Sequence, residues 1–238
     1  MKKGKRYIKH PLLNWSLNPE FNGHNELGFR TAFLGDSKAV YCMGGSSTYC
    51  WGIENTQSFP YLIGKITGHT TINGGVPGYT FLQSFMRFMM WRKMFNVKWV
   101  VVYDGKNDII PLSVGLSNPD YTPVMKRFSP TFFNNDVYSA VYGKRNLRDM
   151  NKNLTSEMRA CLFSHYDNLY HVCKGEGIKC LFIPQVTKTQ FFHKYLSDLS
   201  KYLSKYDMLN IDDSLFYDNT HFSVDGAKKL AEMICERL

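Results

Sequence analysis

The strongest constraint on this chain is a series of short apolar runs that alternate with longer segments of helical periodicity. Runs that are apolar on both faces and rich in β-branched residues are typical of parallel strands that helices cover on both sides. The pattern therefore predicts an α/β fold, a three-layer α/β/α sandwich with a central, mainly five-stranded parallel sheet. The expected strands are Ala39–Met43, Thr70–Asn73, Trp99–Tyr103, Cys180–Pro184 and Met208–Ile211.

Three longer segments place their apolar residues on one face of a helix. We expect these helices over Phe81–Phe95, Leu154–Lys174 and Ser223–Arg237. Ser223 is a suitable N-terminal cap for the last of them. The apolar stripes of these helices are expected to cover the sheet.

The 238 residues suit one domain, because single α/β domains commonly reach about 200 to 250 residues. We expect residues 1–36 to form an N-terminal extension of this domain. Residues 109–147 lack a regular period and are rich in proline and aromatic residues. Long irregular segments in compact domains are often functional. We interpret this insertion either as a lid that faces a substrate or as an excursion that packs on the core.

The composition, with 44% hydrophobic and 21% charged residues, is that of a packed globular protein. The net charge of +9 would suit an anionic partner, but no nucleic-acid-binding motif accompanies it, so we expect no nucleic acid partner. The basic N-terminus lacks the apolar stretch of a signal peptide, and Phe81–Phe95 is too short and too charged to cross a bilayer. The sequence thus favours a cytoplasmic protein without a membrane span.

The six cysteines form no C-x-x-C pair and show no spacing typical of zinc ligands. Several of them lie in apolar runs, where cysteine behaves as a small apolar residue. We therefore expect reduced, structural thiols, no metal site and no bound cofactor.

Glycine-rich or polar segments occur at four places after apolar runs. They are Gly44-Gly45-Ser46, Asn73 to Gly78, Gly105 to Asp108, and Asp218 to His221. Ligands of open parallel sheets bind outside the carboxyl ends of the strands, so these segments are expected to meet at one edge. Gly35-Asp36-Ser37 precedes the first strand and is expected at the opposite edge. This placement favours Ser46 over Ser37 as a nucleophile.

Ser46, His221 and Asp218 have the chemistry of a nucleophilic triad. A serine hydroxyl attacks at neutral pH only when a base removes its proton as the new bond forms, and His221 suits that role. The short spacing lets Asp218 turn back onto His221, hold the Nδ1 proton and leave Nε2 for Ser46. Taken alone, the aspartate and histidine also fit a turn cap beside a structural histidine.

In these four segments the chain resembles the SGNH hydrolases, the superfamily of GDSL-type esterases and lipases. Gly45 stands where the family often has aspartate, and the Gly-Gly-Ser form is similar to one branch of it. The resemblance implies a flavodoxin-like fold and a catalytic triad of Ser46, His221 and Asp218. It also implies an oxyanion hole formed by the backbone N–H groups of Ser46 and Gly78 and by the Asn107 side chain.

Other polar residues near these segments are assigned to structure, and Asp108 is expected to anchor its loop through backbone hydrogen bonds. The others in this group are Asp104, Ser47 and Thr48. Arg30 is interpreted either as an ion-pair partner or as a substrate contact. No G-x-S-x-G elbow is present, which argues against an α/β-hydrolase.

The resemblance implies a serine esterase that hydrolyses O-acyl esters, with O-acetyl groups on a carbohydrate as the expected substrate. The aromatic residues between Tyr121 and Tyr142 would suit stacking on sugar rings. An O-acyltransferase with the same triad, a lipase or thioesterase, and a non-catalytic glycan-binding module remain as alternatives. The expected partner is a small-molecule or glycan ester.

Overall fold

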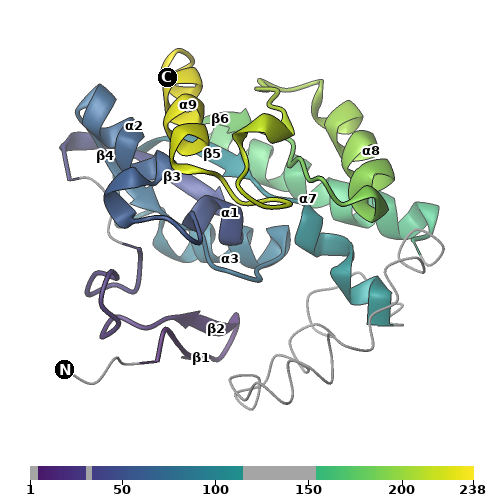
Figure 1. Cartoon of the computed structure of the whole chain (residues 1–238), viewed down its shortest axis with the longest axis horizontal. Coiled ribbons are helices and arrows are strands. Elements are labelled where there is room, and N and C mark those ends of the chain that lie inside the picture. Colours follow the sequence, from purple (N-terminus) through teal and green to yellow (C-terminus); the bar gives the residue numbers. More distant parts are fainter. Residues whose placement is uncertain (1–4, 31–33, 115–153) are drawn as a thin grey trace.

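The computed structural model describes residues 5–30, 34–114 and 154–238. At its centre lies a parallel sheet with the strand order β4-β3-β5-β6 (Figure 1). The strands span Asp36–Gly44 (β3), His69–Asn73 (β4), Val97–Tyr103 (β5) and Lys179–Phe182 (β6). Four of the five expected strands are therefore present, and β3 lies between the two strands that follow it along the chain.

The fifth expected strand, Met208–Ile211, is not a strand in the structure. Met208 forms one parallel bridge with Phe182, and the N–H of Leu209 donates to the Phe182 carbonyl oxygen at 2.9 Å. Beyond this bridge the chain turns away, because the Asp212 side chain accepts a hydrogen bond from Ser214 N at 2.8 Å and starts a 3-10 turn. The prediction that this segment forms a strand is therefore wrong, although a single bridge joins it to β6.

Helices cover both faces of the sheet, as the three-layer prediction requires. Alternate strand residues point to opposite faces. Val40 and Val101 pack with α2 and α9 on one face, and Tyr41 and Val100 pack with α3, α7 and α8 on the other. The helices span Phe59–Thr67 (α2), Phe81–Trp91 (α3), Ser156–Gly175 (α7), His193–Leu203 (α8) and Val224–Cys235 (α9).

All three helices expected from periodicity are present. The expected cap of α9 is also present, because Ser223 Oγ accepts a hydrogen bond from Gly226 N at 2.9 Å. Within the described part of the chain, no helix is both long and apolar enough to cross a membrane. The shorter elements are α1 (Ser46–Tyr49), η1 (Asn55–Gln57), η2 (Lys106–Val114), η4 (Gln190–Phe192) and η5 (Asp213–Leu215).

The expected insertion at 109–147 begins within η2. Its residues from 115 onward lie outside the described residues, and so does the aromatic segment from Tyr121 to Tyr142. The expected lid therefore stays a prediction.

The expected N-terminal extension contains a packed β-hairpin. Strands β1 (Tyr7–His10) and β2 (Asn14–Leu17) pair in antiparallel register, outside the central sheet (Figure 1). Trp15 is buried in a small apolar cluster with Tyr49 and Tyr79, two residues that follow strands of the central sheet. The hairpin thus covers the loops after β3 and β4.

A buried arginine joins this N-terminal region to helix α3. Arg87 donates from Nη1 to Ser16 Oγ at 2.9 Å and from Nη2 to the Gly28 carbonyl oxygen at 2.7 Å. Its guanidinium also lies over the ring of Phe29, 4.3 Å from the centroid. Because Arg87 is 1% exposed, these groups, and not water, contact its buried charge.

Arg87→Ala should lower the free energy of unfolding by about 2–4 kcal/mol, because buried acceptors on Ser16 and Gly28 lose their donor and a cavity forms. Lys93→Ala is the matched control, since Lys93 is largely exposed and its 3.1 Å ion pair with Glu176 is a surface contact. Urea denaturation of the two variants measures the difference. Equal losses in both would contradict the role assigned to Arg87.

Candidate active site

The four segments singled out in the sequence meet at the carboxyl edge of the sheet. Ser46 begins α1 directly after β3, and Lys106 begins η2 shortly after β5. Ser37 lies near the first residue of β3, at the opposite edge, where Asp36 Oδ2 contacts His69 Nδ1 at 3.0 Å. The expected separation of Ser37 from the site is confirmed.

Ser46, His221 and Asp218 form a continuous chain of hydrogen bonds. Ser46 Oγ lies 2.9 Å from His221 Nε2, and His221 Nδ1 lies 2.7 Å from Asp218 Oδ2. The carboxylate accepts a hydrogen bond from Nδ1–H, so Nε2 presents its lone pair to the serine hydroxyl. This geometry lets His221 remove the Ser46 proton while Asp218 stabilises the resulting positive charge.

Asp218 is held in its ionised form. Burial raises the pKa of its carboxyl, but the hydrogen bonds from the His221 ring and from the backbone N–H groups of Thr220 and His221 outweigh this and bring it below its usual value. Both backbone donors lie 2.7 Å from Asp218 Oδ1. The same aspartate therefore caps the turn and orients the histidine.

Hydrogen bonds from neighbouring segments fix the histidine loop. Ser47 Oγ donates to the Thr220 carbonyl oxygen at 2.9 Å, which ties the residue after Ser46 to the residue before His221. Thr187 Oγ1 donates to the Asn219 carbonyl oxygen at 2.8 Å from the loop after β6. These bonds set the distance between the serine and the histidine.

Asn107 contacts the residue that follows Gly78 and lies near Gly45, the residue before Ser46. One N–H of the Asn107 amide donates to the Tyr79 carbonyl oxygen at 2.8 Å, which leaves the second N–H of that amide for a ligand. Gly78 has a φ of +86°, in the left-handed region that favours glycine. Among the described residues, no acceptor is bonded to the backbone N–H of Ser46 or of Gly78.

The glycine at position 45 belongs to this arrangement. A Cβ at Gly45 would lie 2.9 Å from Asn107 Nδ2, closer than real contacts of that kind. An aspartate at this position, which the family often has, would displace the Asn107 amide in this chain. The departure from the family pattern is therefore matched to the position of Asn107.

Two buried carboxyls, Asp104 and Asp108, lie in the same segment as Asn107. Asp108 Oδ1 accepts from Phe81 N at 2.7 Å, as expected for a loop anchor. Its Oδ2 accepts from the hydroxyls of Tyr166 and Tyr195 at 3.3 and 3.2 Å. These contacts fix the loop that carries Asn107 to helices α3, α7 and α8.

Asp104 is the second buried carboxyl, and its surroundings favour the protonated form. Ser84 Oγ lies 2.7 Å from Asp104 Oδ2 and 3.1 Å from the Thr80 carbonyl oxygen, and its single proton serves one of them at a time. When Asp104 is protonated, it donates to Ser84, which then donates to Thr80. Burial, and next the charge of Asp108, raise the pKa of Asp104 well above its usual value.

The remaining polar residues have structural contacts. Arg30 donates to the carbonyl oxygens of Tyr49, Cys50 and Ile53 and is buried, and it forms no ion pair with any residue that the structure describes. His24 contacts Tyr49 Oη at 3.0 Å, and burial is the main reason that its pKa falls to about 4. All six cysteines are free thiols. In the described ranges, no group of three His, Cys, Asp or Glu side chains is placed to hold a metal ion.

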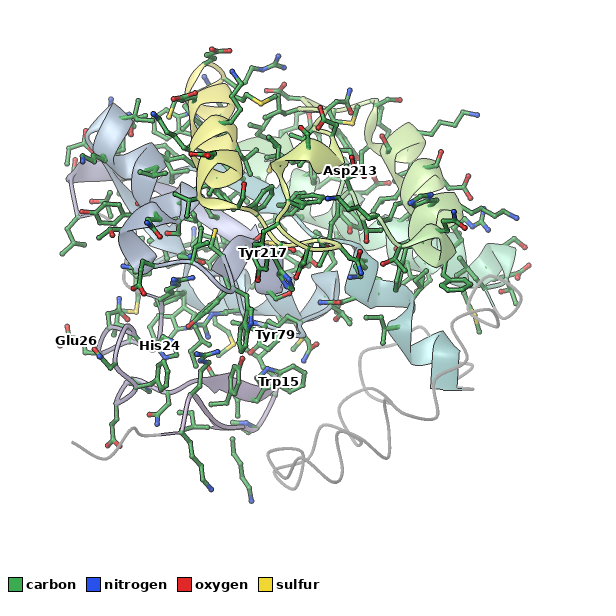
Figure 2. All side chains as sticks on the ribbon, viewed as in Figure 1. Trp15, His24, Glu26, Tyr79, Asp213 and Tyr217 are labelled. Carbon is green, nitrogen blue, oxygen red and sulfur yellow. The ribbon has the colours of Figure 1, made fainter. Side chains whose placement is uncertain are left out.

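Sequence reasoning missed the residues that the N-terminal hairpin brings to the site. Trp15 and Tyr79 lie against each other edge to face, with ring centroids 5.3 Å apart (Figure 2). The Tyr79 hydroxyl donates to the Trp15 carbonyl oxygen, and a Cβ at Gly78 would lie 3.4 Å from Trp15 Cζ2. The alternation of Leu13, Trp15 and Leu17 with polar residues is a strand signal that could have identified this hairpin.

The buried pair Asp104 and Asp108 should make the free energy of unfolding fall as the pH rises from about 4 toward 7. In the unfolded chain both carboxyls ionise near pH 4, whereas burial raises the pKa of Asp108 to about 7 in the folded state. The folded state therefore binds more protons in this range, and deprotonation opposes folding.

Asp104→Asn imitates the protonated acid and should make this decrease shallower. Urea denaturation at pH 5 and pH 8 measures the slope in the wild type and in the variant. Parallel stability curves would contradict this prediction, because they would show that the pKa of Asp104 is the same in the folded and the unfolded chain.

No family model and no curated protein matches the sequence. Solved structures do resemble this chain. A protein assigned to the lipolytic G-D-S-L family, from Desulfitobacterium hafniense, matches with a TM-score of 0.56 and 14% identity over 85% of this chain and 100% of its own. A member of that family from Veillonella parvula matches with a TM-score of 0.53 and 9% identity, over 84% of this chain and 97% of its own.

An acetyl xylan esterase also matches, with a TM-score of 0.53 and 12% identity over 84% of this chain and 99% of its own. At identities this low, the likeness shows a shared fold, and any statement about chemistry has to rest on the residues of this chain. The strand order, the helices on both faces and these likenesses together show that the chain has the fold of the SGNH hydrolases.

Proposed function

We propose that this chain is a serine esterase that forms an acyl-enzyme on Ser46. The observation that carries the proposal is the unbroken chain from Ser46 Oγ through the His221 ring to Asp218, with both hydrogen bonds shorter than 3 Å. A hydroxyl in contact with a neutral imidazole nitrogen, which in turn contacts a carboxylate, is the arrangement that activates a serine for acyl transfer.

The first half of the reaction transfers the acyl group to the enzyme. His221 Nε2 takes the Ser46 proton as Oγ bonds to the ester carbonyl carbon, and the oxyanion accepts hydrogen bonds from Ser46 N, Gly78 N and Asn107 Nδ2. His221 then gives its proton to the alcohol oxygen as the carbon–oxygen bond breaks.

Water completes the second half of the reaction. His221 removes a proton from water, which attacks the acyl carbon, and Ser46 Oγ leaves and recovers a proton from His221. The products are the alcohol and the carboxylic acid, and the enzyme returns to its starting state. Asp218 keeps the imidazole oriented throughout and does not itself take up the proton.

The acyl group that fits this site is small. Trp15 lies directly beside Gly78, so the hairpin limits the space next to the oxyanion donors. An acetyl group on a carbohydrate is the substrate class we propose, and one structure with this fold is named an acetyl xylan esterase.

Ser46→Ala and His221→Ala should each lower kcat/KM for p-nitrophenyl acetate by a factor of about 10⁴ or more, because each removes the means of forming the acyl-enzyme. The double variant should lose little beyond the single ones, since the two residues act as a unit. Ser37→Ala, at the opposite edge of the sheet, should retain the wild-type rate. Intact mass after treatment with an organophosphonate should show one adduct in the wild type and none in Ser46→Ala. Full activity in Ser46→Ala would disprove the mechanism.

Asn107→Ala should lower kcat about 100- to 1,000-fold while leaving KM nearly unchanged, because the lost donor acts mainly on the transition state. Asn107→Asp is the matched variant: it keeps the size of the side chain but removes the amide N–H, and we expect a loss at least as large. Steady-state kinetics on p-nitrophenyl acetate give both values. A loss confined to KM would place Asn107 in ground-state binding instead.

A further inference from the structure

An exposed tyrosine lies beside the histidine of the triad. The rings of Tyr217 and His221 are nearly parallel, with an interplanar angle of 23° and centroids 6.2 Å apart. Tyr217 is 51% exposed, although it immediately precedes Asp218 in a loop whose other aromatic residues, Phe216 and Phe222, are buried. Figure 2 shows it near the middle of the molecule, above Tyr79 and Trp15 in that view. Its exposure is therefore a property of this position and not of the loop.

The orientation of Tyr217 is fixed at both ends. Its backbone N–H donates to the His221 carbonyl oxygen at 3.0 Å, and its hydroxyl donates to the Trp51 carbonyl oxygen at 3.3 Å. A Cβ at Gly52 would lie 2.3 Å from the Tyr217 hydroxyl oxygen, and Gly52 has a φ of +92°. The Tyr217 ring thus spans the distance from the histidine loop to the end of α1. It lies over Gly52, a position where a larger residue would not fit.

Trp51 adds a second exposed aromatic side chain at the end of α1. It is 38% exposed, and its N–H donates to the Ser46 carbonyl oxygen at 3.0 Å, one turn after the nucleophile. The Arg6 guanidinium lies over the Trp51 ring, 4.2 Å from the centroid. Trp51 therefore has a fixed support within the protein while part of its surface faces solvent.

The chemistry of ester cleavage determines which part of a substrate meets these rings. The acyl oxygen faces Gly78 and Asn107, where Trp15 limits the space. The alcohol oxygen has to lie within reach of His221 Nε2 to receive its proton. The remainder of the alcohol then extends from His221, the residue beside which Tyr217 lies.

We propose that Tyr217 and Trp51 form the subsite for the alcohol part of the substrate, and that this alcohol is a sugar ring. A pyranose presents C–H groups on one face, which pack on an aromatic ring, and hydroxyls at its rim, which stay in water. Half-exposed rings fixed in place suit such a ligand better than an acyl chain, which requires an enclosed apolar channel. The inference rests on the proposed esterase function and adds its specificity.

The test compares two acetate esters that differ in the alcohol, β-D-xylose tetraacetate and ethyl acetate. Tyr217→Ala should lower kcat/KM for the sugar ester roughly fivefold to tenfold more than for ethyl acetate, mainly through KM. Tyr217→Phe keeps the ring and should retain the wild-type preference within about twofold. Ile66→Ala removes an exposed apolar side chain from the C-terminal turn of α2, at the opposite edge of the sheet, and should not change the ratio.

A binding measurement separates this inference from the esterase proposal. In a Ser46→Ala background the ester stays intact, so binding can be measured without hydrolysis. There, Tyr217→Ala should raise the Kd for β-D-xylose tetraacetate roughly fivefold to tenfold, as measured by ligand-observed NMR titration. Tyr217-dependent binding without hydrolysis by the wild type would support the subsite and overturn the esterase. Hydrolysis with equal losses on both esters and unchanged sugar binding would overturn the subsite, and would leave Tyr217 as a shield for the bond between Asp218 and His221.

Discussion

Strand β3 is hydrogen-bonded to β4 on one side and to β5 on the other. Because the chain passes from β3 out to β4 and then back across to β5, the loops that follow β3 and β5 diverge from neighbouring points on the sheet edge. Ser46 lies on the first of these loops and Asn107 on the second. A shift of β3 by one residue in this pairing would exchange its two faces and move Ser46 away from Asn107.

Side chains at or next to the proposed reacting groups hold the loops of the candidate site in place. Ser47 holds the histidine loop, Tyr79 holds the Asn107 amide, and Asp108 holds the N-terminus of α3. Each of these contacts joins a backbone atom to the side chain either of a proposed catalytic residue or of the residue next to one. The polar atoms of Ser46 and His221 are thus placed accurately while their own hydrogen-bonding capacity stays available to each other and to a substrate.

The sequence predicted the parts of this protein that depend on local patterns. Strands β3, β5 and β6 contain short apolar runs and β4 contains the β-branched residues Thr70, Thr71 and Ile72. Asp218 with His221 is a contact within one turn, so these features can be recognised from neighbouring residues. The prediction of a fifth strand was wrong because Met208–Ile211 has the apolar pattern of a strand but forms only one bridge to the sheet before the turn at Asp212. The place of Trp15 beside Gly78 depends on contacts between residues far apart in the chain, such as the bond from Gln83 Nε2 to the Leu13 carbonyl oxygen at 3.0 Å, and no local pattern encodes those.

The two sides of the candidate site are built differently, and the difference follows from which part of the chain supplies each wall. On the proposed acyl side, Trp15 comes from a hairpin that packs its apolar residues inward against Tyr49 and Tyr79, so a buried ring lies next to Gly78. On the alcohol side, Tyr217 comes from a turn constrained by Asp218 and His221, so its ring has a fixed edge and an exposed surface. A buried ring next to the proposed oxyanion donors and an exposed ring next to the proposed base are the basis on which we propose a short acyl group on a large alcohol. That combination is the reverse of a long-chain lipid ester, in which the acyl part is the larger one.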